Sequence, residues 1–200
     1  MNRSGIDEII AFIERWSNGT QVSRYRAEPL PDTLPRSILA LNDRLGGFWK
    51  PPPFPFGPVE LDHNTERGLF DVQDYIVNPN EVVPDEGGIT PLIHENQGNW
   101  AFGYSEDHKL LIKGDWITDK SDQRFFDWVD FPAEIEDALI YTLLLNFYFY
   151  SGYELNEKDR DFEKSTTVLL WSNPNWSTFW TNEKFNILLF EGFAPVKSTP

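Results

Sequence analysis

The stretch ITPLIHENQGNWAFGY, residues 89–104, decides the fold of this chain. Its first part predicts a short apolar strand around Leu92 and Ile93, and residues 95–99 predict a polar corner. No nucleophile, metal-ligand cluster or phosphate-binding loop lies within it. The stretch therefore indicates the core of a sheet, and it favours a binding protein over an enzyme.

The second half of this stretch alternates large and small side chains. Trp100, Phe102 and Tyr104 are separated by Ala101 and Gly103. Because successive side chains of a strand point to opposite faces, this spacing puts three aromatic rings on one face and almost nothing on the other. We expect the rings in the core, and a close neighbour such as a helix or a second backbone on the small face.

Two segments of the chain resemble one known family. The apolar strand that runs into ENQGNW and an aromatic strand is similar to the central hairpin of the SUKH superfamily. The segment LPDTLPRSILALNDRLGG, residues 30–47, is similar to the family's N-terminal helix, which opens at a Leu-Pro pair and stops at Gly-Gly. The two matches and the spacing between them cover about half of the chain, and residues 151–200 lie outside the resemblance.

The resemblance implies a fold and a role. The SUKH superfamily includes bacterial immunity proteins and Smi/Knr-type regulators of cell-wall synthesis. It implies a twisted, mainly antiparallel sheet with packed helices, here with a C-terminal elaboration. It also implies a non-enzymatic protein-binding module, either an immunity protein that neutralises a cognate toxin by masking it or a regulatory scaffold of cell-wall synthesis.

Apolar periodicity in the rest of the chain predicts an α+β order of elements rather than repeated strand–helix–strand units. The expected helices run from Ile6 to Trp16, capped by Ser4 with Asp7 as the capping-box acid, from Pro35 to Gly46, and from Ala133 to about Phe149. The expected strands outside the hairpin are Leu69–Val77, Leu110–Ile112 before a turn at Gly114-Asp115, Thr166–Trp171 and Phe185–Phe190, with an Asn/Trp/Pro-rich loop between the last two.

Length and composition bound the organisation of the chain. With 200 residues, Trp 8 and Phe 16, the sequence can fill a single core, so we expect one domain over residues 1–200. Its core would span about residues 1–150, and residues 151–200 would be the elaboration. Cys 0 excludes disulfides and thiolate metal sites.

Two features of the sequence predict a cytoplasmic protein. Acidic residues such as Asp7 and Glu8 interrupt the N-terminal apolar pattern, which argues against a secretory signal. The most apolar stretch, residues 138–150, is too short to span a bilayer.

The net charge of −15 is unevenly distributed. Residues 1–50 carry 7 basic and 6 acidic side chains, whereas residues 51–200 carry 10 and 26. Such a field repels nucleic acid and anionic membrane, so neither is an expected partner. It attracts basic proteins such as a basic toxin domain, although acidity can also serve solubility alone.

The proline-rich segment, residues 51–58, cannot be a helix or a central strand. With its aromatic residues it could be a ligand for an aromatic groove. The simpler interpretation is a rigid connector whose Phe54 and Phe56 are buried.

The residues that carry most enzyme chemistry are missing or scattered. His63, His94 and His108 lie far apart and outside any metal-binding motif. The run Asp159–Glu163 alternates oxygen ligands but lacks the glycine and the distal glutamate of a calcium loop. We therefore expect no catalytic residues, no metal and no cofactor.

The candidate partner-binding surface is the acidic and aromatic run from Asp115 to Asp130, DWITDKSDQRFFDWVD. Trp and Phe are typical of binding hot spots, and acids around them can form a charged rim. The alternative is a loop whose aromatic rings dock into the domain while its acids stay hydrated. The candidate residues are Asp115, Trp116, Asp119, Asp122, Asp127, Trp128 and Asp130.

A rival function from another class is carbohydrate binding or glycan hydrolysis. Exposed tryptophans suit sugar rings, and glycoside hydrolysis needs only two carboxylates. One open cleft that gathers the aromatic rings and two facing carboxylates would favour that rival.

Overall fold

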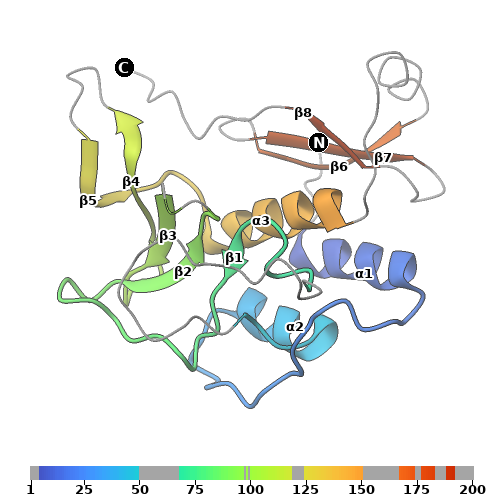
Figure 1. Ribbon diagram of the computed structural model, residues 1–200, viewed down its shortest axis with the longest axis horizontal. Helices are drawn as coiled ribbons and strands as arrows, with labels where there is room; N and C mark the ends of the chain where they lie inside the picture. The colour runs from blue at the N-terminus through green and yellow to red at the C-terminus, as the bar shows by residue number, and fades with distance from the viewer. Residues whose placement is uncertain are drawn as a thin grey trace.

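The computed structural model describes residues 5–49, 68–96, 98, 100–118, 124–150, 167–173, 177–182 and 188–191. Within those ranges the chain forms, in order, α1 (Ile6–Ser17), α2 (Arg36–Leu45), β1 (Tyr75–Ile76), β2 (Thr90–His94), β3 (Trp100–Tyr104), β4 (Leu110–Thr118), β5 (Arg124–Asp130), α3 (Ile135–Tyr150), β6 (Thr167–Asn173), β7 (Ser177–Asn182) and β8 (Leu188–Glu191). Figure 1 shows the helices beside a larger sheet, with a smaller sheet along α3. The fold is α+β, as predicted.

The larger sheet is an antiparallel meander in which the strand order β1-β2-β3-β4-β5 follows the chain. The predicted hairpin is its centre, with β2 and β3 on either side of the corner; Gln97 and Asn99 of that corner lie outside the described residues. Phe102 of β3 lies opposite Ile93 of β2 and Ile112 of β4. Because paired residues share a face, this register gathers apolar side chains on the inner face of the sheet.

The inner face forms the core, as the alternation predicts. Trp100, Phe102 and Tyr104 are 7%, 1% and 7% exposed. The ring of Phe102 lies 5.1 Å from that of Trp100 and 5.0 Å from that of Phe131, edge to face in both cases. These rings belong to one buried cluster with apolar residues of all three helices.

The outer face has close neighbours at Gly103, as expected: two side chains and one backbone carbonyl. A Cβ atom added to Gly103 would lie 2.8 Å from Cγ2 of Ile89, 2.9 Å from Cη2 of Trp128 and 3.0 Å from the carbonyl oxygen of Thr90. The Trp128 indole therefore packs directly over the glycine. Because Trp128 was a candidate partner-binding residue, this contact bears on the surface described below.

Helix α3 is buried on nearly all sides from Ile135 to Phe147. It starts two residues later than predicted, because residues 131–134 form a cap: the N–H of Glu134 donates to Asp137 Oδ2 at 3.3 Å, and the N–H of Asp137 donates to the Glu134 carbonyl at 3.0 Å. Its inward polar residue, Asn146, binds the loop before β1 through its side chain.

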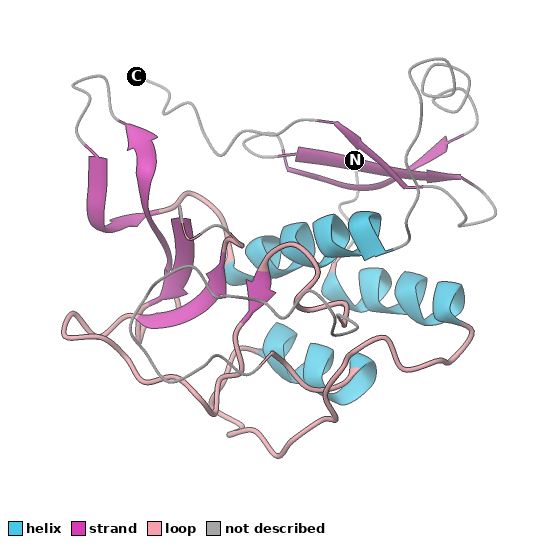
Figure 2. Cartoon of the chain, viewed as in Figure 1, coloured by secondary structure: helices cyan, strands magenta, loops and turns pink. Residues whose placement is uncertain are grey.

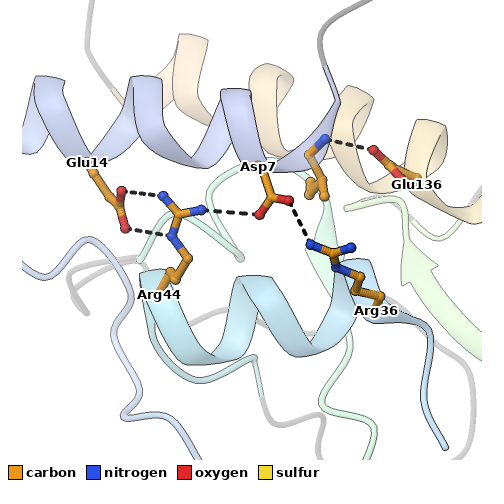
Figure 3. Close-up of polar contacts among 6 residues, drawn as sticks. Asp7, Glu14, Arg36, Arg44 and Glu136 are labelled. Atoms are coloured by element: carbon orange, nitrogen blue, oxygen red, sulfur yellow. Dashed lines mark hydrogen bonds and ion pairs between the residues drawn. The ribbon is translucent and has the colours of Figure 1, made fainter.

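The start of α1 corrects the predicted capping box. The N-cap residue is Gly5, which has no side chain, and Ser4 lies outside the described residues. The N–H of Ile6 donates instead to Oε1 of Glu136 in α3, at 2.7 Å. Asp7 turns away from the backbone and binds Arg36 and Arg44 of α2, each at 3.3 Å, as Figure 3 shows. A carboxylate at a helix N-terminus is favourable, so Glu136 joins α1 to α3.

The smaller sheet has the order β6-β7-β8 and lies along α3 (Figure 1). The sequence predicted β6 and part of β8, but β7 replaces much of the expected loop. In β7, Ser177, Phe179 and Thr181 are buried, so the strand has the alternation of a half-buried strand that its Asn- and Pro-rich flanks hid. The Phe179 ring lies 6.2 Å from that of Tyr141 in α3, so this sheet shares the core of the larger one.

Two further strand predictions are wrong in extent. The expected strand Leu69–Val77 is reduced to β1, since residues 69–74 form turns tied to Asn146. The expected turn at Gly114-Asp115 does not exist, and β4 continues through it to Thr118. Gly114 lies opposite Trp100, and a glycine in that position leaves room for a large ring across the ladder.

Two sequence features remain predictions. The proline-rich segment 51–58 and the run Asp159–Glu163 lie outside the described residues. Among the helices that are described, none combines the length and the apolar character that crossing a membrane requires.

Candidate protein-binding surface

The structure turns the acidic and aromatic run into two strands rather than a loop. Asp115 and Trp116 lie in β4, where only their backbone is described, and Asp119 and Asp122 lie outside the described residues. Asp127, Trp128 and Asp130 lie in β5. Figure 2 shows β4 and β5 at one border of the molecule, apart from the helices. The strand β5 was missed because its Asp and Arg residues masked the alternation of its apolar side chains.

The described residues of β5 divide into exposed acids and a docked ring. Asp127 and Asp130 are exposed, and Trp128 is half-buried. The indole Nε1–H of Trp128 donates to Oδ2 of Asp85 at 2.6 Å, and Nζ of Lys113 lies 5.6 Å from the centre of its ring. Trp128 is therefore a docked aromatic residue, as in the alternative interpretation of this run. Asp127 and Asp130 remain exposed to solvent.

Asp85 is an acid of this surface that the sequence did not indicate. Desolvation by burial acts to raise its pKa, but hydrogen bonds from the backbone N–H groups of Ile89 and Gly87 and from the Trp128 indole outweigh it, so its pKa lies below the usual value. Asp85 therefore stays ionised and holds Trp128 in place. We call Asp85, Asp127, Trp128 and Asp130 the acidic β5 surface.

The hairpin tip between β3 and β4 adds a cation at the border of this surface. Nζ of Lys109 lies 3.0 Å from Oδ2 of Asp107. The pKa of Lys109 is raised above its usual value, first by the hydrogen bond to Asp107 and then by the charges of Asp107 and Asp130. Asp130 therefore lies within the electrostatic range of a lysine.

A second acidic site is buried behind the corner of the β2–β3 hairpin. Asp74 is 2% exposed, and its Oδ1 accepts the N–H of Asn96 at 3.3 Å. Desolvation by burial, reinforced by the charge of Glu95 and opposed by the Asn96 hydrogen bond, raises the pKa of Asp74 to about 7. The backbone of residues 73 and 74 is fixed by Asn146, whose Oδ1 accepts both N–H groups at 2.9 Å.

Sequence reasoning missed Asp74 because it assigned residues 69–77 to one strand. The available signal was the pair Asp71 and Asp74 within that apolar stretch, together with Asn146 in an otherwise apolar helix. Asp71 is also 2% exposed, and its Oδ2 lies 3.9 Å from Nη1 of Arg24. Polar residues at buried positions need partners, so such pairs predict a polar network.

His94 of β2 belongs to no metal-binding group among the residues that the structure describes. Desolvation by burial, followed by the charge of Lys113, lowers the pKa of His94 to about 4, so its ring is neutral at neutral pH. Among the described residues, no group of three His, Asp or Glu side chains is placed to hold a metal ion.

Comparisons with known proteins give no relative: no family model matches the chain, and neither the curated proteins nor the solved structures include a match. The SUKH resemblance therefore remains a prediction from residues 30–47 and 89–104.

Proposed function

We propose that this chain is a non-enzymatic protein-binding module that presents its acidic β5 surface to a basic partner protein. The observation that carries the proposal is the pair of exposed carboxylates, Asp127 and Asp130, on a strand at the border of the sheet. The charge distribution supports the proposal, because residues 51–200 carry 10 basic and 26 acidic side chains and account for all of the net negative charge. Complementary charge raises the rate at which partners meet.

The SUKH resemblance supports a narrower form of the proposal. An immunity protein that masks a basic toxin domain in the cytoplasm would use such a surface, and a regulatory scaffold of cell-wall synthesis could use it as well. The two roles differ in the partner, so the product of the neighbouring open reading frame is the first protein to test.

The carbohydrate alternative is less well supported. Among the tryptophans whose side chains are described, Trp49, Trp100 and Trp171 are 5%, 7% and 1% exposed. Buried rings cannot stack on a sugar. Trp128 is half-buried and its indole N–H is bound to Asp85.

The test is the binding kinetics of the partner protein on the immobilised full chain at low salt. Replacing Asp127→Lys together with Asp130→Lys should slow association, because charge acts mainly on the association rate. The matched control is Glu8→Lys with Asp32→Lys, which changes the net charge equally at exposed positions of α1 and the loop before α2. Equal slowing by both pairs would show that only the net charge matters. An unchanged rate for the β5 pair would reject this surface.

A further inference from the structure

Strand β5 has an open backbone edge. It is the last strand of the larger sheet, and within the described residues it pairs only with β4. The N–H of Phe131 donates to the Leu110 carbonyl of β4 at 2.9 Å, and Val129 lies opposite Ile112. In an antiparallel ladder, successive residues turn their N–H and C=O groups alternately toward and away from the partner strand. The C=O of Trp128 and both the N–H and the C=O of Asp130 therefore point away from β4, whereas the register shifts between Ile112 and Gly114 and the alternation is not carried past Trp128.

Acidic side chains flank this edge of the sheet. Asp130 lies opposite Leu111, on the outer face. Val129 shares the inner side with Ile112, and Asp127 follows in the segment where the register shifts. Both aspartates are exposed. Between them, Trp128 is fixed by Asp85 and packed over Gly103, which keeps the strand in place.

We propose that the open edge of β5 binds an extended lysine- or arginine-rich segment of the partner protein as an added β-strand. The inference rests on the proposed function and deepens it by naming the backbone groups that the partner uses. Trp128 and Asp130 supply the backbone groups that the segment binds, and Asp127 and Asp130 attract its basic side chains. In strand addition, the main chain gives affinity and the alternate side chains give specificity.

Charge argues for a basic segment over a second copy of this chain. Antiparallel pairing of two β5 strands about a twofold axis would bring Asp127 and Asp130 of both copies close together. Like charges on paired strands are destabilising, and charged edge strands resist pairing with themselves. The net charge of −15 opposes self-association further.

The first test uses the full chain and a synthetic probe, a blocked heptapeptide of alternating lysine and threonine. Two more versions carry N-methyl groups on the odd or on the even residues. Methylation removes the donors on one side of an extended peptide, so only one of the two sets should face β5. We expect the unmodified peptide to slow hydrogen exchange at the amide of Asp130, and one methylated peptide to bind roughly tenfold more weakly than the other.

The second test acts on the protein. Asp130→Pro removes an N–H that points away from β4 and leaves the ladder intact, since proline is tolerated on an edge strand when its N–H side faces solvent. The matched control Asp130→Asn loses the same charge and keeps the N–H. We expect the proline variant to bind the peptide about fivefold more weakly than the asparagine variant, with equal unfolding midpoints.

Three outcomes would overturn strand addition. Salt-dependent binding without protection of the Asp130 amide, or equal binding by both methylated peptides, would mean that charge alone holds the peptide. The acidic β5 surface would then still bind a basic partner, and the proposed function would stand. No binding by any version of the peptide would also reject strand addition, and the partner kinetics would then decide the proposed function separately.

Discussion

The two faces of the five-stranded sheet come from the same strands but are covered in different ways. The inner face packs against the helices through Trp100, Phe102 and Tyr104. The outer face is covered at Gly103 by one indole and one isoleucine, and the strand that supplies the indole keeps its acids exposed. One alternation of large and small residues thus separates a face that stabilises the fold from a border whose described acids are exposed.

The largest expected effect concerns the inner face. Replacing Phe102→Ala should lower the free energy of unfolding by about 3–5 kcal/mol, because the lost ring leaves a cavity among rings that relax poorly. Phe149→Ala is the matched control, since Phe149 is 47% exposed, and it should cost much less. Denaturant titration measures both. Similar midpoints for the two variants would contradict the assignment of the inner face to the core.

The second effect concerns Asp74, the buried acid between the sheet and α3. Its folded pKa of about 7 lies above its unfolded value, so the folded state holds a proton that the unfolded state loses. The contribution of Asp74 to stability is therefore fully present below about pH 4 and is lost as the pH rises through about 7. Asp74→Asn, which keeps an oxygen acceptor, should be more stable than the wild type at pH 8 by on the order of 3 kcal/mol.

The measurement is the difference in unfolding free energy between this variant and the wild type at several pH values. His94 works in the opposite direction, because its folded pKa is lowered to about 4 and its stabilisation is lost as the pH falls below its unfolded value of 6.5. The difference between Asp74→Asn and the wild type cancels this contribution. A difference that does not grow between pH 4 and 7 would show that Asp74 is ionised in the fold.

The sequence predicted the inner face of the larger sheet well and its border at β4 and β5 poorly. The strong alternation from Trp100 to Tyr104 and the apolar stripes of the helices predicted the hairpin, the core and the α+β order. At Gly114 the sequence predicted a turn, but the chain continues as a strand there because Gly114 pairs with Trp100 of β3. The hydrogen bond between Trp128 and Asp85 could not be predicted from the sequence, because the two residues lie 43 positions apart and meet only in the folded chain.

The third effect concerns the outer face. Gly103→Ala should lower the free energy of unfolding by about 1–3 kcal/mol, because the added methyl group meets the Trp128 indole and the Thr90 carbonyl at about 3 Å. Trp128→Leu in the same chain should reduce that cost, so the two substitutions should not be additive. Thermal or chemical unfolding of the single and double variants measures the coupling. Strict additivity would mean that Trp128 does not cover Gly103.

The double variant Asp127→Asn with Asp130→Asn should have the smallest effect on stability. It also gives the most direct test of the proposed binding surface. Because both side chains are exposed, its unfolding free energy should stay within about 0.5 kcal/mol of the wild type.

The decisive measurement is the association rate with the partner protein over a series of salt concentrations. We predict a steep fall with salt for the wild type and a clearly shallower one for this variant, since salt screens charges that remain on the surface. Identical salt dependence in the two proteins would contradict the claim that the acidic β5 surface recognises the partner.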